Sequence, residues 1–207
     1  MTFWSKLRVS WQAHKTRRKM NRQFGRREDP FSYETTPYEA ARLIAMDEAL
    51  GAGPLGPVLE VGCAEGHFTD KLARRSSRVL ALDISTVALA RARRRVPGIV
   101  FVEADLLAWE PGAQGLFEAV VIGDVLYYLD RPGVGAEFDA LFPRIASWLK
   151  TGGRLLLAHG FSSDQELAHR RSFRTRFENA GLRLVSETIP DADRGGVRCL
   201  LSTLKKI

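Results

Sequence analysis

The sequence predicts an α/β domain built on a mostly parallel sheet, because two patterns occur together. From residue 58 onward, short runs rich in Val, Leu and Ile alternate with longer stretches of helical periodicity. The last two runs have no helix between them, so we expect them to pair as an antiparallel hairpin at one edge of the sheet. The other strands are joined through helices and are expected to lie parallel.

The expected elements follow in chain order. A helix over residues 34–50 precedes the sheet, and the Gly- and Pro-rich segment 51–57 ends it. The expected strands are residues 58–63, 78–83, 99–103, 117–123, 154–159, 182–188 and 197–203. The expected helices between them are residues 67–75, 86–95, a stretch around 135–150, and 164–180 before Gly181. The turn-rich residues 190–196 join the last two strands.

Length and composition limit the classes of protein to consider. The chain has 207 residues, which corresponds to one domain with room for an extension. With 45% apolar and 27% charged residues its composition is globular, and no apolar run is long enough to cross a bilayer. The two cysteines, Cys63 and Cys199, are too few for a disulfide scaffold or a four-cysteine zinc site, and both are expected to be packing residues. No His, Cys, Asp or Glu cluster has metal-ligand spacing, so we expect no metal.

Charge is distributed unevenly along the chain. Residues 1–27 contain nine of the 31 Lys and Arg and no Asp or Glu. The remaining residues, 28–207, therefore hold 22 basic and all 24 acidic side chains, a net charge of −2. The sequence predicts a basic amphipathic N-terminal arm over residues 1–27 and a nearly neutral domain over residues 28–207. The net charge of +7 thus belongs to the arm and does not mark the whole chain as nucleic-acid binding.

Within the arm, Phe3, Trp4, Leu7, Trp11 and His14 recur at helical spacing, with Lys and Arg around much of the remaining circumference. Such a helix suits a membrane interface, a partner protein or the body of its own chain. A solvated basic arm that shelters a few aromatic rings is the alternative. The arm lacks the apolar core and cleavage site of a secretory signal, although its composition is that of an organelle-targeting peptide. We expect a cytoplasmic protein, and the arm raises the alternative of peripheral binding to the inner membrane face.

The most specific pattern is the run VLEVGCAEG over residues 58–66. An apolar strand there ends in a loop that carries Gly62 and Gly66 and leads directly into a helix. Glycines at such positions let the backbone turn sharply and approach a ligand closely. The next strand ends at Asp83, about 20 residues on, where a carboxylate can accept hydrogen bonds from the hydroxyls of a ribose. Asp105 follows the strand after that and could accept from the exocyclic amine of an adenine.

Four residues at strand ends together indicate a ligand site more strongly than any one of them does. Gly62, Asp83, Asp105 and Asp124 stand at the C-terminal ends of successive expected strands. In an open α/β sheet, ligands bind outside those ends. Any single acid of the series could instead be a loop or helix-cap residue, but the whole series in register favours a ligand site.

The string EVGCAEG resembles the E/D-x-G-x-G-x-G motif of the class I S-adenosylmethionine-dependent methyltransferases, with Ala64 in place of the central glycine. The resemblance implies a Rossmann-like three-layer sandwich whose seven-stranded sheet ends in an antiparallel hairpin. It also implies S-adenosylmethionine as the cofactor and S-adenosylhomocysteine as the product. By position, the glycine loop would cradle the methionine part, Asp83 the ribose and Asp105 the adenine, with Leu106 packing on the ring. The full set of cofactor contacts that we predict is Phe31, Arg42, Glu60, Gly62, Cys63, Gly66, Asp83, Ile84, Asp105, Leu106 and Asp124.

Within that superfamily the chain resembles the nodulation protein S (NodS) family. The shared features are the string DPFSYETTPYEAAR over residues 29–42, here called the leader, the strings LEVGCAEGHFT and VLYYL, and the ending RCLLS. The resemblance covers about residues 28–207 and leaves the arm out. It implies N-methylation of the free amine of a terminal glucosamine on a chitooligosaccharide. Phe31 and Arg42 would close the site, with Arg42 pairing with the carboxylate of the cofactor. Asp124 stands where the family has a glutamate and Phe31 where it has a tryptophan, so the glycan acceptor stays open.

Methyl transfer from a sulfonium is an in-line displacement, in which an enzyme mainly positions the reactants in a dry pocket. An amine acceptor has to be neutral when it attacks, so a group that takes up its proton helps. Asp124 and, as second candidate, His159 stand at strand ends and are the predicted catalytic residues. His159 could instead be satisfied by a backbone carbonyl. Tyr127 and Tyr128 are predicted to contact the acceptor, the alternative being one core and one surface residue.

We therefore expect a methyltransferase for a small molecule or a glycan that acts on an amine or a hydroxyl. An RNA methyltransferase whose arm grips phosphates is less expected, because the body is slightly negative and has no appended RNA module. A non-catalytic cofactor-binding module is the third alternative. The Asn/Asp-Pro-Pro-Tyr motif of adenine-N6 enzymes and the Pro-Cys pair of cytosine-C5 enzymes are absent, which excludes both classes.

Overall fold

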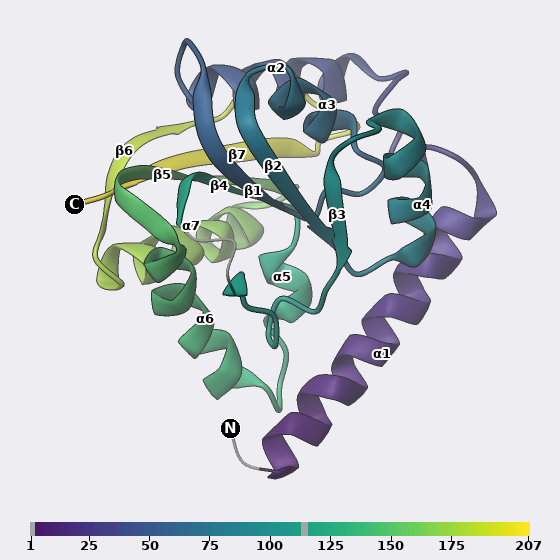
Figure 1. Cartoon of the computed structure of the whole chain (residues 1–207), viewed down its shortest axis with the longest axis vertical. Helices are drawn as coiled ribbons and strands as arrows, with labels where there is room; N and C mark the ends of the chain where they lie inside the picture. Colours follow the sequence, from purple (N-terminus) through teal and green to yellow (C-terminus); the bar gives the residue numbers. More distant parts are fainter. Residues whose placement is uncertain (1–2, 113–115) are drawn as a thin grey trace.

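The computed structural model describes residues 3–112 and 116–207 and shows one seven-stranded sheet (Figure 1). Its strands are β1 (Leu55–Val61), β2 (Ser76–Asp83), β3 (Val100–Glu103), β4 (Phe117–Gly123), β5 (Leu149–Phe161), β6 (Leu182–Thr188) and β7 (Arg198–Lys206). They lie in the order β3-β2-β1-β4-β5-β7-β6. Strand β7 runs antiparallel to both β5 and β6, whereas the pairs among β1 to β5 are parallel. The predicted mostly parallel sheet with an antiparallel hairpin at its edge is confirmed.

Helices cover both faces of this sheet (Figure 1). The described helices are α1 (Phe3–Arg26), α2 (Pro37–Ala49), α3 (His67–Ala73), α4 (Thr86–Arg95), α5 (Leu126–Leu129), α6 (Gly135–Trp148) and α7 (Asp164–Asn179). Helices α2, α3 and α4 share one apolar cluster with the sheet, and α6 and α7 share another on the opposite face. The strands divide their side chains between the two clusters, as Val58 and Leu59 of β1 illustrate. The result is a three-layer sandwich.

Hydroxyl side chains set the starts of three helices. Thr36, Ser85 and Ser163 each accept a hydrogen bond from the backbone N–H three residues on, at the N-termini of α2, α4 and α7. Pro37 occupies the first turn of α2, where a missing N–H costs nothing. These local signals explain why the predicted bounds of α4 agree with the structure residue for residue.

The largest difference from the predicted elements lies between α6 and β5. The sequence predicts a helix to about residue 150 and a strand from residue 154, but β5 already begins at Leu149. Leu149 pairs with Phe117 of β4, and the register then shifts so that Arg154 pairs with Ala119. This irregularity takes up the intervening residues within the strand, a feature that local periodicity does not reveal.

The predicted N-terminal arm is helix α1, and its docking face is not the expected one. Val9, Met20 and Phe24 are buried against the body, whereas Trp4 and Trp11 of the predicted apolar stripe face away from it. The side chain of Phe3 lies outside the described residues. The helix therefore docks on its own chain through a face that the stripe did not indicate.

Polar contacts along α1 strengthen this docking. The Gln12 amide donates to the carbonyl of Leu129, the Ser85 hydroxyl donates to the Asn21 side chain at 2.7 Å, and Arg17 pairs with Glu103. The helix thus packs along the body of the molecule rather than extending from it (Figure 1).

Two smaller predictions can be compared directly. Cys63 and Cys199 are both free thiols and both buried, as expected of packing residues. Among the described residues, none of the helices combines the length and the apolar character needed to traverse a bilayer.

Candidate active site

A cavity of about 430 Å³ lies at the carboxyl ends of the central strands. It is a common size for small-molecule sites, and it lies where the strand order reverses between β1 and β4. Its walls also include the inner face of α1, the leader and the loop before β7. Predicted site residues that line it are Phe31, Arg42, Gly62, Asp83, Ile84, Asp105, Leu106, Asp124, Tyr127 and Tyr128.

Four predicted site residues lie outside this cavity. Glu60 and Cys63 border a separate space of about 20 Å³ beneath the glycine loop. Gly66 begins α3 with φ +84°, and a Cβ there would lie 3.2 Å from Cβ of Ala92. Gly66 thus lets α3 pack on α4, and it is not among the residues that line the cavity. His159 is the fourth such residue.

The glycine loop keeps the backbone shape that its motif predicts. At Gly62, φ is +82° and a Cβ would lie 2.7 Å from the carbonyl oxygen of Gly123, so no other residue fits. Ala64, which replaces the central glycine, still has a φ of +48°. A left-handed conformation costs an alanine about 1 kcal/mol, which the hydrogen bond from its N–H to Asp83 helps to offset.

Glu60 anchors the loop from below. Its carboxylate accepts a hydrogen bond from the Thr69 hydroxyl at 2.6 Å, which ties β1 to α3. The side chain is buried, and burial raises the pKa of Glu60 to about 7. Glu60 thus supports the loop and does not face the cavity.

Asp83 and Asp105 present carboxylates at the ends of β2 and β3. Asp83 accepts from the N–H groups of Ala64 at 2.9 Å and Ser85 at 2.8 Å, one on each oxygen. Each oxygen keeps a lone pair for a further donor, such as a hydroxyl. Asp105 accepts from the N–H of Leu107 at 3.2 Å. Burial raises the pKa of both carboxyl groups.

An ion pair joins the leader to the end of β4. Arg42 is buried and donates to Asp124 at 2.6 Å and to Glu39 at 2.9 Å. Asp124 also accepts from Gly160 N–H at 2.7 Å and from the Tyr127 hydroxyl at 3.2 Å. Burial alone would raise the pKa of Asp124, but Arg42 and these other contacts outweigh it and hold that pKa below its usual range. Asp124 is therefore a stable anion and a weak base.

Arg42 is only partly available for the predicted role as a partner of the cofactor. Both of its terminal nitrogens already bind carboxylates of this chain. Its Nε is buried and has no hydrogen-bond partner among the described residues. Glu39, which shares Arg42 with Asp124, also lines the cavity, and burial raises its pKa. Glu39 was not among the predicted site residues, although it precedes Arg42 by three positions on the expected helix.

His159 is packed behind the cavity wall. Its ring meets Tyr127 edge to face at 6.1 Å, and its Nε2 has no hydrogen-bond partner among the described residues. Burial lowers the pKa of His159 to about 4, so the ring is neutral near pH 7. The geometry favours Asp124 over His159 as the side chain that meets an acceptor.

Tyr127 and Tyr128 form an aromatic wall of the cavity, with ring centroids 4.6 Å apart. The guanidinium of Arg170 lies over the Tyr127 ring at 4.1 Å and donates to the carbonyl of Gly160. His169 holds another guanidinium nitrogen at 2.8 Å. Arg170 also lines the cavity, and nothing in its local sequence distinguished it from the other arginines of α7.

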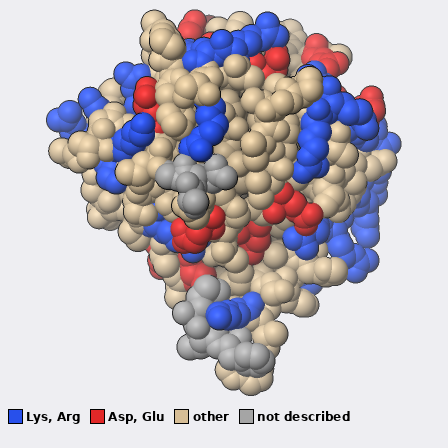
Figure 2. Space-filling view, in the orientation of Figure 1, with Lys and Arg blue, Asp and Glu red and all other residues tan. Residues whose placement is uncertain are grey.

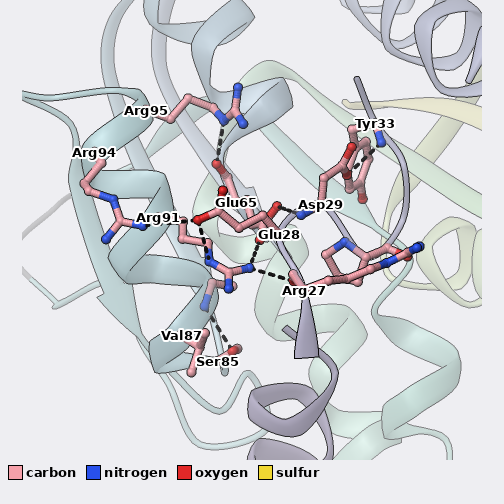
Figure 3. A network of polar contacts seen from close by, with 12 residues as sticks. Arg27, Glu28, Asp29, Tyr33, Glu65, Ser85, Val87, Arg91, Arg94 and Arg95 are labelled. Carbon is pink, nitrogen blue, oxygen red and sulfur yellow. Dashed lines mark hydrogen bonds and ion pairs between the residues drawn. The ribbon is translucent and has the colours of Figure 1, made fainter. Parts of the chain in front are cut away.

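A second ionic cluster fixes the leader to the glycine loop (Figure 3). Glu65 is buried and pairs with Arg91 of α4, while its other oxygen accepts from the N–H of Asp29 at 2.9 Å. Arg91 also donates to the carbonyl of Arg27 at 3.0 Å. The Glu65–Arg91 pair thus joins the end of α1, the leader and the loop, and Phe31 of the leader lines the cavity.

The fold also gathers Asp29, Glu65 and His67, whose potential ligand atoms lie within 4.8 Å of one another. Sequence spacing did not predict this grouping. The carboxylate oxygens already accept from Arg91 and from the backbone N–H groups of residues 29, 33 and 34. These contacts give the acids a role in holding the leader.

Comparison with known proteins shows a family match and several sequence relatives. The family described as "Nodulation protein S (NodS)" matches residues 13–190. This match begins inside α1, so the similarity extends further toward the N-terminus than the predicted start at residue 28. Nodulation protein S of Sinorhizobium fredii is 31% identical over 86% of this chain and 84% of its own length. That of Rhizobium tropici is 33% identical over 70% of this chain, and the chain spans 60% of that relative's length.

One further sequence relative and two solved structures are also similar to this chain. A trans-aconitate 2-methyltransferase of Acidovorax is 30% identical over 59% of this chain and 48% of its own length. The structure of N-methyltransferase NodS from Bradyrhizobium japonicum WM9 with S-adenosyl-L-homocysteine superposes with a TM-score of 0.79. It covers 92% of this chain and 98% of its own, at 24% identity. Magnesium protoporphyrin IX methyltransferase of Synechocystis, with bound S-adenosylmethionine, superposes at 0.69 and 18% identity over 95% of this chain and 97% of its own.

Proposed function

Because the chain belongs to the nodulation protein S family of class I S-adenosylmethionine-dependent methyltransferases, we propose that its cavity binds S-adenosylmethionine and methylates a nitrogen of a small acceptor. The observation that carries the proposal is the row of carboxylates at successive strand ends, Asp83, Asp105 and Asp124, all lining one cavity. An amino sugar or a similar amine is the acceptor class that we propose.

The residues of the cavity fit this cofactor. Gly62 lines the cavity without a side chain, and the Asp83 carboxylate has lone pairs left for a diol. Asp105 offers an acceptor for an exocyclic amine, and Ile84 and Leu106 offer apolar surface for a flat ring. The unpartnered Nε of Arg42 is a donor suited to a carboxylate. We assign Asp83 to the ribose, Asp105 with Ile84 and Leu106 to the adenine, and Arg42 to the methionine carboxylate.

The acceptor side is built around Asp124. When bound, S-adenosylmethionine supplies an electrophilic methyl group, and its transfer to a neutral amine leaves positive charge on a nitrogen that then loses a proton. Arg42 keeps Asp124 ionised, so the carboxylate can accept a hydrogen bond from the acceptor N–H and stabilise that charge. Glu39 lies beside the same ion pair with a raised pKa, and we propose that it takes up the proton.

The aromatic wall supports a ring-shaped acceptor. Tyr127 and Tyr128 present ring surface to the cavity, and Arg170 stiffens Tyr127 by stacking on it. Apolar ring faces beside charged groups suit a sugar, whose CH faces are apolar and whose amine is polar.

The test is transfer of labelled methyl from S-adenosylmethionine to a panel of acceptors. Chitooligosaccharides with a free terminal glucosamine amine are compared with their fully N-acetylated counterparts, with trans-aconitate and with total RNA. Asp83→Asn is the variant expected to abolish cofactor binding, and Asp164→Asn, an exposed acid outside the cavity, is its matched control.

Label on the free amine, lost in the acetylated sugar and in Asp83→Asn but kept in Asp164→Asn, is the expected result. Label on trans-aconitate alone would overturn the amine assignment, and label in RNA would overturn the acceptor class. Equal S-adenosylhomocysteine binding by the wild type and Asp83→Asn, measured by calorimetry, would overturn the cofactor site itself.

A further inference from the structure

The outward face of α1 carries an apolar patch beside a cationic one. Trp4, Leu7 and Trp11 repeat at helical spacing on the side opposite the docked residues and are 70%, 47% and 62% exposed. Exposed large apolar side chains grouped at one end of a helix are unusual for a surface that meets only water. The inner face of the same helix lines the cavity, so this outward patch has no part in the site already described.

Basic side chains continue the same face toward the C-terminus of α1. Lys15, Arg18 and Arg22 follow Trp11 at the same spacing and are exposed, and no described carboxylate pairs with any of them. Residues 1–27 hold nine Lys and Arg and no acid, while the rest of the chain has a net charge of −2. Figure 2 shows blue side chains along the flank, at lower right, where Figure 1 places α1. We call this surface, Trp4 to Arg22 on the outward side, the outer face of α1.

From this geometry we propose that the outer face of α1 docks the protein on an anionic lipid surface. Tryptophan and leucine side chains would enter the headgroup boundary, where the amphipathic indole ring is most stable. The basic side chains that continue the same face would meet the lipid phosphates. The positive end of the helix dipole also lies at the end that carries Trp4. The buried inner face keeps α1 attached to the body while the outer face contacts the lipid.

Two other occupants fit the outer face less well. A nucleic acid would use the cations and could stack bases on the tryptophans, but Leu7 adds nothing to such a contact, and the rest of the chain has a slightly negative net charge. A second copy of the chain would present the same face of α1, and residues 1–27 contain no acidic side chain to meet its cations. Anionic lipid complements both halves of the outer face at once.

The experiment measures binding of the full chain to lipid vesicles. Phosphatidylcholine vesicles with and without phosphatidylglycerol are titrated, and tryptophan emission is recorded with co-sedimentation. Trp109 and Trp148 are partly or fully buried, so a blue shift on binding reports Trp4 and Trp11. One variant, Lys15→Gln with Arg18→Gln and Arg22→Gln, removes charge. A second, Leu7→Ser with Trp11→Ser, removes the apolar patch.

The matched control removes three exposed cations elsewhere: Lys150→Gln, Arg183→Gln and Lys205→Gln, on the strands β5, β6 and β7. The wild type and this control are expected to bind anionic vesicles alike with a blue shift. The charge variant should bind roughly 100-fold more weakly, from several-fold per cation, and the apolar variant should lose the shift. Circular dichroism and S-adenosylhomocysteine binding check that each variant is folded.

Failure to bind anionic vesicles would overturn the proposal. So would an equal loss in the control triple, which would show that only net charge matters. Binding of a transfer-RNA probe that is tighter than vesicle binding and lost in the charge variant would assign the face to nucleic acid. A dimer in light scattering that the apolar variant converts to a monomer would assign it to a second copy.

Discussion

The Glu65–Arg91 pair predicts that its two single substitutions differ in cost. Glu65 is the buried partner, with 3% of its side chain exposed, whereas Arg91 is 17% exposed. Replacing Arg91 by Met leaves a buried carboxylate without its cation, which costs about 3–5 kcal/mol of folding free energy. In Glu65→Gln, the amide oxygen can still accept from Asp29 N–H and Arg91 keeps the carbonyl of Arg27, so the cost should be about 1 kcal/mol.

The double variant sharpens this prediction. Glu65→Gln with Arg91→Met removes both charges, so it should be more stable than Arg91→Met alone, by about 2 kcal/mol of coupling. Urea unfolding at pH 7 gives the free energies, and hydrogen exchange at the N–H of Asp29 reports local opening of the leader. Because that N–H donates to Glu65, its exchange should accelerate in Arg91→Met.

An exposed pair on the same face of the sheet provides the control. Asp70 of α3 and Arg74, which caps the end of that helix, lie one turn apart with side chains 40% and 74% exposed, so Arg74→Met should cost no more than about 0.5 kcal/mol. If Arg91→Met proved no more destabilising than Glu65→Gln, the inference that the carboxylate is the buried, dependent partner would be refuted.

Three further predictions concern the glycine loop and the cavity. Because burial raises the pKa of Glu60 from 4.5 to about 7, its contribution to stability is complete below pH 4.5 and is lost as pH rises through 7. Urea unfolding at pH 5 and 8 should show that Glu60→Gln removes up to about 3 kcal/mol of this pH dependence. An equal pH dependence in the wild type and Glu60→Gln would contradict this prediction. Asp124→Asn removes the carboxylate proposed to stabilise the acceptor, one of two that Arg42 binds, and should lower turnover about 100-fold while S-adenosylhomocysteine binding by calorimetry changes far less. Turnover within threefold of wild type would count against the role of Asp124. Gly62→Ala should lower the free energy of unfolding by more than about 2 kcal/mol, because its Cβ would collide with Gly123. Gly53 has a similar φ of +90° but open space around it, so Gly53→Ala should cost about 1 kcal/mol. Similar thermal denaturation of the two variants would show that backbone strain and not the collision dominates.

Much of the fold and the ligand edge could be predicted from the sequence. Apolar-rich runs of five to seven residues that alternate with helices specify a parallel sheet, and the residues that follow each parallel strand then lie at one edge of it. Asp83, Asp105 and Asp124 were found this way, and all three line the cavity. Gly62 could be predicted because its left-handed conformation leaves a local signature in the motif.

Two other residues close to strand ends were harder to place. Gly66 and His159 stand in the right segments but lie outside the cavity, because which side of a loop or strand faces the ligand depends on packing above it. His159 lies behind Tyr127, which comes from the preceding strand-end segment and covers it. The β5 start was also missed, because its irregular pairing with β4 has no local pattern.

The sequence by itself determined the order of strands and helices, the helix starts and the strand-end carboxylates, since each depends on local periodicity, caps or turns. Only the tertiary structure decided which of these side chains meet. Arg42 and Asp124 are 82 residues apart in the chain, and Glu65 and Arg91 are 26 apart. Such pairs depend on how far each helix is rotated about its axis when it packs, and burial of a whole face sets that rotation. The same reason explains why α1 buries the face opposite to the predicted stripe. The stripe could be predicted from the spacing of its apolar residues, but the face that contacts the body depends on packing.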